Sequence, residues 1–294
     1  MTQLSSSIQN QSLAVATWYD RVWPFARLLW LNEDNLAVHL GYWDENTRSH
    51  AESLINMNQA MAERVGMFQG ARVLDAGCGF GGTSLWLAKE YGARVVGVNI
   101  SSDQVARANH YAKKRGLDDF VSFENVNLLN TGLPDGSFDI FWAQESLLHI
   151  LDKQLFLAEA YRLLKPGGKL VVQDSYLFNR TYSQKEERHL QAISSGGLIP
   201  RLPRPDEFIT WARTVGFQDI CIEDISHYAK RSCIRSYRQN MFFYPIGQVL
   251  RTLRIQSEQE YRSALGNFAL YRTFQLGLWF LAICTARKSE LAQG

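Results

Sequence analysis

Four closely spaced glycines follow a short apolar run that contains one acidic residue. Residues 73–82 read Val-Leu-Asp-Ala-Gly-Cys-Gly-Phe-Gly-Gly. Glycine adopts positive φ at little cost and lets a ligand come close to the backbone. A helix that begins after such a loop offers unpaired N–H groups and the positive end of its dipole. The pattern predicts a loop that cradles a nucleotide-type cofactor, with an adenosine-containing molecule as the expected ligand.

A second pair of residues has the chemistry of a general acid and a general base. Glu145 and His149 are four residues apart, after a run of apolar residues that ends near Ala143. In a helix this spacing places both side chains on one face, and a side chain just after a parallel strand lies at the edge where such sheets bind ligands. We expect the pair to exchange protons with a substrate. In the alternative interpretation Glu145 caps a helix and His149 is a packed or cofactor-side residue.

The elements that must position these residues alternate between strands and helices. Strands are predicted at residues 72–75, 94–99, 121–125, 138–143, 169–174, 219–225 and 278–286. Helices are predicted at residues 84–91, 103–115, 152–164 and 206–215, the third ending before Lys-Pro-Gly-Gly. This alternation predicts an α/β fold, a doubly wound and mostly parallel seven-stranded sheet with a helical N-terminal cap and a helical insertion before the last strand.

The same pattern divides the chain into three parts. Residues 1–12 are polar and are expected to form a flexible arm, residues 13–66 an aromatic cap, and residues 67–294 a cofactor-binding core. Within the core, residues 226–275 are expected to form an inserted lid. The lid is rich in Lys and Arg, which would clamp a diphosphate or carboxylate or else form a solvated helix face.

Composition excludes several classes of protein. The chain has 294 residues, 31 Lys and Arg, 29 Asp and Glu, and a net charge of +2, so no overall field recruits nucleic acid or an anionic membrane. The four cysteines lack Cys-x-x-Cys spacing, which argues against a metal site and a disulfide framework. No secretory signal or membrane span is expected, and the most apolar segment, residues 274–285, is interpreted as a buried strand. We therefore expect a cytoplasmic protein, and a homo-oligomer is left open.

The glycine loop alone permits two cofactors. Its Gly77-x-Gly79-x-x-Gly82 spacing also fits the dinucleotide-binding pattern, in which an acidic residue about 20 positions later binds a ribose hydroxyl. An NAD-dependent oxidoreductase is therefore a rival interpretation. Asp75 before the loop, and an amide rather than a carboxylate at Asn99, favour the other cofactor described next.

Two later motifs carry a family resemblance. Residues 133–139 read Leu-Pro-Asp-Gly-Ser-Phe-Asp and residues 163–170 read Leu-Leu-Lys-Pro-Gly-Gly-Lys-Leu. With the glycine loop, they resemble class I S-adenosylmethionine-dependent methyltransferases. The resemblance is greatest to the small-molecule branch of sterol, tocopherol and prenyl-diphosphate methyltransferases and cyclopropane fatty acid synthases. That branch has elements similar to His-Leu-Gly-Tyr-Trp at 39–43 and Gln-Glu-Ser-x-x-His at 144–149.

The resemblance implies a cofactor site for S-adenosylmethionine. Asp75, Gly77, Gly79 and Gln144 would lie near the methionine portion, Asn99 and Ile100 at the ribose and adenine, and Asn127 and Leu128 beside the adenine, with Gln104 and Tyr19 completing the set. The family more often has an acidic residue at the positions of Asn99 and Asn127, although an amide also forms hydrogen bonds there. An aromatic ring such as that of Tyr19 attracts a sulfonium through cation–π interaction.

The implied reaction is methyl transfer to a small, largely hydrophobic metabolite, without a metal and without nucleic acid or stable membrane insertion. Carbon methylation of a prenyl or sterol-like acceptor is the first expectation. The alternatives are N- or O-methylation of an alkaloid amine or a phenol, and a non-catalytic cofactor-binding protein. Glu145 and His149 would supply the base that a hydroxyl acceptor or a carbocation intermediate requires, whereas a tertiary amine requires none.

Overall fold

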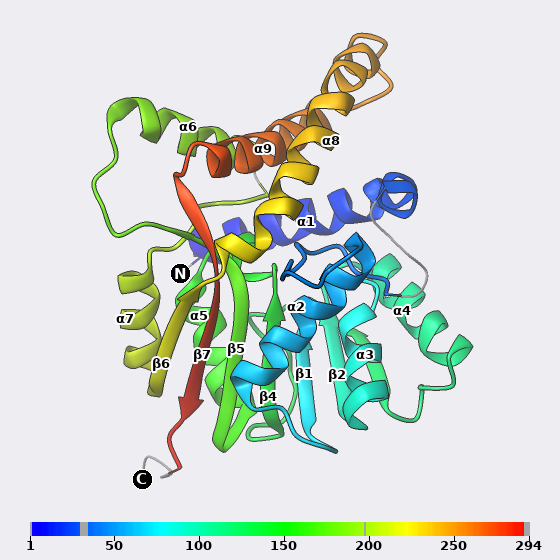
Figure 1. Cartoon of the computed structure of the whole chain (residues 1–294), viewed down its shortest axis with the longest axis vertical. Coiled ribbons are helices and arrows are strands. Elements are labelled where there is room, and N and C mark those ends of the chain that lie inside the picture. The colour runs from blue at the N-terminus through cyan, green and yellow to red at the C-terminus, as the bar shows by residue number, and fades with distance from the viewer. Residues whose placement is uncertain (1, 30–34, 197, 291–294) are drawn as a thin grey trace.

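The computed structural model describes residues 2–29, 35–196 and 198–290. Its central feature is one sheet with the strand order β3-β2-β1-β4-β5-β7-β6. The strands are β1 (Arg72–Ala76), β2 (Arg94–Asn99), β3 (Val121–Asn125), β4 (Phe138–Gln144), β5 (Leu164–Leu177), β6 (Phe217–Asp224) and β7 (Trp279–Lys288). Figure 1 shows the sheet with the carboxyl ends of β1, β2, β4 and β5 at the top. The predicted fold class is confirmed.

Strand direction distinguishes this sheet from a dinucleotide-binding one. Strands β1 to β5 pair in parallel, whereas β7 lies between β5 and β6 and is antiparallel to both. The dinucleotide fold has the order 3-2-1-4-5-6 without an antiparallel insertion. The strand order reverses between β1 and β4, and such sheets bind ligands in the crevice at the carboxyl ends beside that point.

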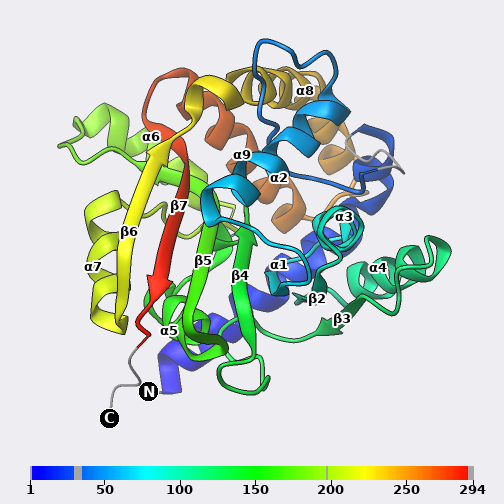
Figure 2. The same cartoon turned by 60° about the horizontal axis from the view of Figure 1, so that its bottom comes forward.

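Neighbouring strand residues face opposite sides of the sheet, and each side has its own core. Val73 and Trp142 lie in one apolar cluster, whereas Leu74 and Phe141 lie in the other, as expected for side chains that alternate along a strand. The first side is covered by α2 (His50–Val65), α3 (Gly82–Tyr91) and α4 (Ser102–Lys114), and the second by α5 (Lys153–Leu163) and α7 (Pro205–Val215). Figure 2 shows α2 and α3 in front of the sheet and α5 and α7 behind it.

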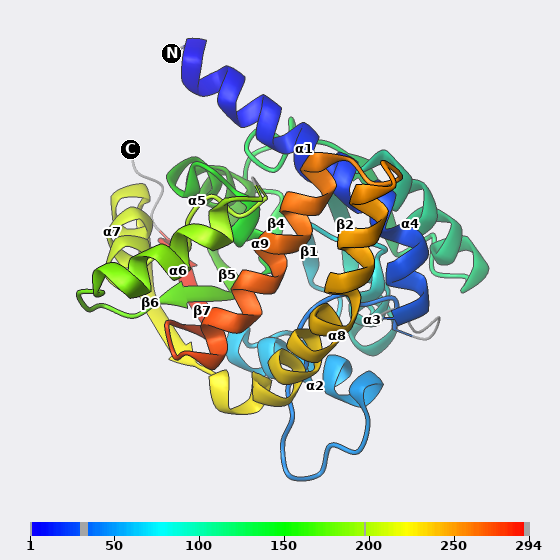
Figure 3. The same ribbon diagram turned by 90° about the horizontal axis from the view of Figure 1, so that it is seen from above.

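The remaining helices lie across the carboxyl edge of the sheet. They are α1 (Thr2–Leu29), α6 (Gln184–Ser194), α8 (Ser226–Thr252) and α9 (Glu258–Gln275). Seen from above in Figure 3, α1, α8 and α9 cross over the strand ends. We call α1, α8 and α9 the helical cover. No helix in the described ranges is long and apolar enough to cross a membrane.

Residues 2–12, expected to form a flexible arm, begin helix α1, and Gln11 contacts the backbone of His149. Two local expectations differ from the structure. Helix α9 continues to Gln275, so residues 274–285 are only partly a strand. The segment 145–149 is no α-helix: only residues 147–149 form a single 3-10 turn, η1 (Leu147–His149).

Candidate active site

The glycine loop turns directly at the carboxyl end of β1. Gly77 has φ +89°, and the N–H groups of Gly77 and Cys78 both donate to the Val98 carbonyl at the end of β2, at 2.9 and 3.1 Å. A Cβ atom on Gly77 would lie 2.6 Å from the Cβ of Ser146, which follows β4. Only glycine therefore fits here, since both the dihedral angle and the close approach exclude a side chain.

Asp75 supports the loop from below. Its side chain is buried at 2% exposure, and the Ser84 hydroxyl in the first turn of α3 donates to its Oδ2 at 2.6 Å. Burial raises the pKa of Asp75 to about 6, although its hydrogen bonds with Ser84 oppose the shift. The carboxylate therefore ties β1 to the start of α3 and keeps the loop between them in one conformation.

Several buried polar atoms beside the loop lack a hydrogen-bond partner among the described residues. They include Gln144 Nε2, Ser146 Oγ and Gln173 Oε1, all at the carboxyl ends of β4 and β5. The other end of the Gln144 amide accepts from Thr83 Oγ1 at 3.0 Å. Leaving a buried polar atom unsatisfied costs about 1–3 kcal/mol. A polar ligand in the adjoining loop would satisfy these atoms, so the residues present fit the expected cofactor.

Glu145 follows Gln144 in a strained conformation. Its φ is +48°, and its Oε1 accepts from Leu40 N at 2.6 Å and from Gln173 Nε2 at 3.3 Å. Burial, with a smaller contribution from the nearby Asp174, raises the pKa of Glu145 to about 8. At neutral pH the group is therefore mostly protonated, which makes it a hydrogen-bond donor rather than a strong base.

His149 occupies a better position for a base. Its Nδ1 lies 2.9 Å from the Leu198 carbonyl, and its Nε2 lies 3.0 Å from the Tyr19 hydroxyl of α1. Because a carbonyl only accepts, Nδ1 must carry the proton, and Nε2 then accepts from Tyr19. Burial lowers the pKa of His149 to about 4 and raises that of Tyr19. The imidazole is neutral at physiological pH, with its lone pair on Nε2.

Two buried ionisable residues that the sequence interpretation missed complete this end of the sheet. Asp174 on β5 is 1% exposed and accepts from Leu148 N at 3.0 Å and from Ser175 N at 2.7 Å. Burial raises its pKa to about 7 and lowers that of Lys153 to about 8. Asp174 thereby holds the short 3-10 turn η1 against β5. In the sequence, Asp174 could have been recognised as a charged residue inside the apolar run of β5.

The expected adenine and ribose contacts follow β2 and β3. Asn99 Nδ2 donates to Gln104 Oε1 at 2.8 Å, and Asn99 Oδ1 accepts from Ser101 N at 3.1 Å. Asn127 Oδ1 accepts from Leu129 N at 2.9 Å, a local turn bond. Ile100 and Leu128 are half-buried against the two cores. The structure thus gathers these residues at neighbouring strand ends, with part of each amide used internally.

The segment at 39–43 joins the sheet edge to the helical cover. Besides the Leu40–Glu145 bond, Gly41 N and Trp43 Nε1 both donate to Ser232 Oγ of α8, at 3.0 and 2.9 Å. The rings of Tyr42 and Tyr228 stack with their centroids 4.1 Å apart. This segment therefore holds α8 over the end of β4, close to Glu145.

The cover contributes buried apolar and aromatic groups to the same region. Tyr271 of α9 is 5% exposed and Cys233 of α8 is fully buried. Both lie near enough to Glu145 for its charge to raise their pKa values further above the ordinary range, after the larger effect of burial. A substrate at this edge would meet ionisable groups below and apolar groups above.

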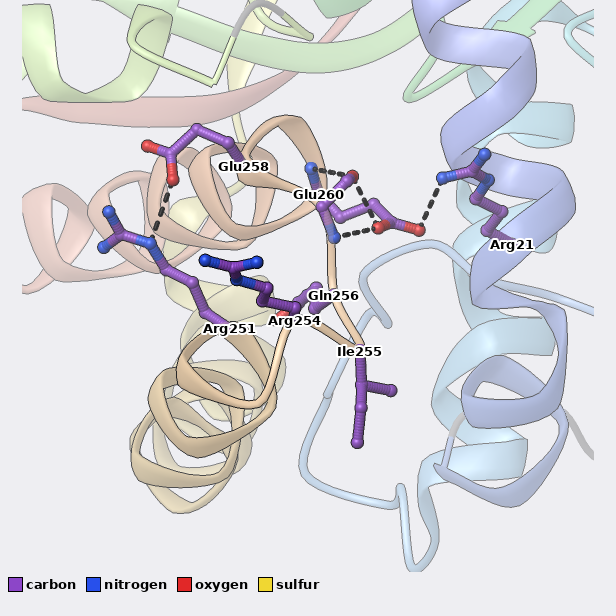
Figure 4. A pocket seen from close by; sticks show the side chains of 8 residues that line it. Arg21, Arg251, Arg254, Ile255, Gln256, Glu258 and Glu260 are labelled. Carbon is purple, nitrogen blue, oxygen red and sulfur yellow. Dashed lines mark hydrogen bonds and ion pairs between the residues drawn. The ribbon is translucent and has the colours of Figure 1, made fainter.

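A separate cavity lies at the far side of the cover. It has a volume of about 720 Å³ and is lined mainly by charged residues of α1, of the end of α8, of the turn after it and of the start of α9. Figure 4 shows Arg21 paired with Glu260 and Arg251 paired with Glu258 across it. None of the predicted site residues lines this cavity, so it is distinct from the sheet-edge site.

Comparison with known proteins supports a relationship over most of the chain. Residues 74–172 match a family described as a methyltransferase domain. The chain is 32% identical over 196 residues to 27-O-demethylrifamycin SV methyltransferase of Amycolatopsis mediterranei (strain S699), covering 66% of this chain and 71% of that protein. It is 36% identical over 165 residues to methyltransferase GfsG of Streptomyces halstedii, covering 55% and 58%. The crystal structure of the 4+2 cyclase SpnF matches with a TM-score of 0.74 and 26% identity, covering 94% and 95%.

Proposed function

Because the chain belongs to the class I S-adenosylmethionine-dependent methyltransferases, we propose that it methylates a hydroxyl group on a bulky, largely apolar small molecule. The observation that carries this proposal is the neutral His149, whose Nε2 lone pair accepts from Tyr19 at the carboxyl end of β4. Family membership also decides between the two cofactors that the glycine loop permits, in favour of S-adenosylmethionine.

We propose that the predicted residues hold the cofactor along the strand ends. They are Asp75, Gly77, Gly79 and Gln144 for the methionine portion, with Asn99, Ile100, Gln104, Asn127, Leu128 and Tyr19 around the remainder. The unsatisfied Gln144 Nε2 and Ser146 Oγ support this assignment, since a bound polar group would satisfy both. When bound, the cofactor supplies a methyl group on a sulfonium, whose departure as a thioether needs no protonation.

The chain's own residues then have to remove one proton and exclude water. As the acceptor oxygen forms its bond to the methyl carbon, its proton passes to the Tyr19 oxygen while the Tyr19 proton passes to His149 Nε2. The bound cofactor would supply the methyl group, with the electron pair of its C–S bond kept on sulfur. Because the pKa of Tyr19 is raised, the phenol is protonated before the reaction. Tyr19 therefore passes a proton to His149 and is not itself the final base. The helical cover closes the site to water.

Two observations support oxygen as the methylated atom and an apolar acceptor. The relative from Amycolatopsis mediterranei is named for an acceptor that lacks a methyl group on an oxygen. Two buried residues lie beside the Tyr19–His149 pair: Leu198, whose carbonyl accepts from His149 Nδ1, and Tyr271, which is close enough to Tyr19 to affect its own pKa. Carbon methylation, the first expectation from the sequence, uses the same base to remove a proton from a carbocation and stays a prediction.

The experiment is incubation with methyl-labelled S-adenosylmethionine and separate acceptors: hydroxylated macrocyclic polyketides, phenols, sterols, prenyl diphosphates and amines. The proposal expects label in a methyl ether of an apolar acceptor. Label on carbon or nitrogen only would overturn it. Because SpnF is named a cyclase, the product mass is also measured. An acceptor that changes structure without gaining a methyl group would equally contradict the proposal.

A further inference from the structure

Charge is distributed unevenly between the lid segment and the rest of the chain. Residues 226–275 contain eight Lys and Arg and two Glu, whereas the remaining residues contain 23 Lys and Arg and 27 Asp and Glu. Helix α8 itself has no acidic residue over its 27 residues. The near-neutral total of the chain therefore hides a basic helix on an otherwise acidic protein.

Arginines and apolar residues of α8 share one face of the helix. Positions 231, 235, 238, 242, 246, 249 and 253 are separated by three or four residues, so they form one continuous stripe. We call this stripe the α8 outer face. Its residues are Arg231, Arg235, Arg238, Phe242, Ile246, Val249 and Leu253. The first half is thus basic and the second half apolar.

The apolar half is exposed to an unusual degree. Phe242 is 70% exposed, Val249 57% and Leu253 62%. Figure 1 shows the C-terminal part of α8 projecting from the body of the protein at the top, and Leu253 is the C-cap of that helix. The other side of α8 is where the helix packs, through buried residues such as Cys233 and through Tyr237, which stacks on Phe268 of α9. Exposed apolar groups clustered on one face indicate a surface with a partner.

The basic half places three arginines around a shallow hollow whose exposed lining is mainly apolar. Arg231, Ile234, Arg235, Arg238 and Gln239 line a hollow of about 470 Å³. Within the described ranges no carboxylate forms an ion pair with Arg231 or Arg238, although Arg231 lies over the Trp43 ring at 5.4 Å. Guanidinium groups bind phosphate oxygens bidentately. The arginines therefore favour a negatively charged partner over the apolar half of the α8 outer face.

We propose that the α8 outer face docks the protein onto the surface of an anionic phospholipid bilayer. Apolar residues on a helix enter the boundary between head groups and acyl chains, while basic residues beside them bind lipid phosphates. Positive charge without acids on α8 complements such a surface and disfavours a second copy of the same basic helix. Docking is peripheral, and it places the protein beside a membrane that would contain an apolar acceptor.

The test is co-sedimentation of the full-length protein with vesicles, measured without turnover and therefore independent of the proposed reaction. The vesicles consist of phosphatidylcholine alone or of phosphatidylcholine mixed with phosphatidylglycerol. Binding is expected to the mixed vesicles, and raised salt is expected to release the protein. Equal binding to both vesicle types, or no binding to either, would overturn the proposal.

Matched variants separate the two halves of the face. Removing charge with Arg231→Gln and Arg238→Gln should weaken vesicle binding about fivefold for each arginine. Phe242→Glu with Leu253→Glu should abolish binding, whereas Leu155→Glu, at a position 44% exposed on α5, should leave it unchanged. Circular dichroism checks that each variant is folded. The proposal is overturned if the variant with Phe242→Glu and Leu253→Glu keeps wild-type vesicle binding. It is also overturned if that variant instead dissociates a dimer seen by sedimentation velocity, because the α8 outer face would then bind a second copy of the chain.

Discussion

The glycine-loop edge and the helical cover meet at the same end of the sheet but are built in different ways. At the edge, backbone groups and close packing fix the geometry: Gly77 N and Cys78 N share one carbonyl, and Gly77 lies against Ser146. In the cover, α1 and α9 are joined by an exposed ion pair, Arg21–Glu260, at 2.9 Å. Backbone groups and close packing hold the edge in one geometry, whereas the contacts of the cover are made by side chains and include exposed ion pairs.

The difference assigns separate tasks to the two regions. A cofactor shared by a whole family needs one geometry, which tight backbone packing supplies. An acceptor that differs between relatives needs a surface that substitutions can reshape without unfolding the core. Tyr19 and His149 stand between the regions, since one comes from the cover and the other from the sheet edge.

Gly77→Ala should break the edge and leave the cover intact. The added Cβ meets Ser146 at 2.6 Å and the residue must keep φ +89°, so we expect S-adenosylhomocysteine affinity to fall by at least about 100-fold. Isothermal titration calorimetry measures it. The control is Gly116→Ala, also at positive φ but with open space around it, which should bind normally. Normal binding by Gly77→Ala would contradict a single fixed geometry at the edge.

Glu145→Gln should change how the free energy of unfolding depends on pH. An acid whose folded pKa is raised keeps its proton in the folded state after the unfolded chain has lost it. The contribution of Glu145 to the free energy of unfolding should therefore fall as pH rises from about 4.5 to about 8, the range between its unfolded and folded pKa values. The variant should lose this contribution and keep those of Asp174, Asp75 and His149, whose pKa values are also shifted.

Urea denaturation at a series of pH values measures this effect in the absence of cofactor. The difference in free energy of unfolding between wild type and variant should change by a few kcal/mol at most across the range, at about 1.4 kcal/mol for each pKa unit. Superimposable pH profiles for wild type and Glu145→Gln would show that Glu145 does not titrate as described.

Arg21→Gln should have the smallest effect. The ion pair with Glu260 has side-chain exposures of 56% and 25%, and exposed pairs contribute about 0–1 kcal/mol. Thermal unfolding should shift by only a few degrees at most, and the shift should vanish at high salt. A large loss of stability from this variant would mean that the cover is as rigidly built as the edge.

The sequence predicts the edge far better than the cover, for a physical reason. Glycine, proline and short apolar runs determine backbone conformation locally. The loop at Gly77, the strand at 94–99 and, to within one residue, the end of the helix at Leu163 could therefore be predicted from the sequence. The helical spacing considered for Glu145 and His149 does not occur, because Glu145 has φ +48° and only residues 147–149 form a 3-10 turn. A positive φ at a residue other than glycine leaves no local pattern in the sequence.

The contacts made by the helical cover could not be predicted from the sequence either. The polar composition of residues 2–12 favours an arm, yet they form part of α1, where Gln11 donates to the His149 carbonyl at 2.7 Å. The Tyr19–His149 bond joins residues 130 positions apart. Only the buried charge of Asp174 inside an apolar strand was a readable signal of the missed site residues.

The most direct test of the account compares transfer rate with cofactor affinity in His149→Ala. In single-turnover reactions with a hydroxyl acceptor, the account predicts a rate about 10²–10⁴-fold below wild type, with S-adenosylhomocysteine affinity nearly unchanged. His110→Ala, at an exposed position of α4, is the control and should match wild type in both measurements. An unchanged transfer rate, or a loss of affinity as large as the loss of rate, would contradict the assignment of His149 as the proton acceptor.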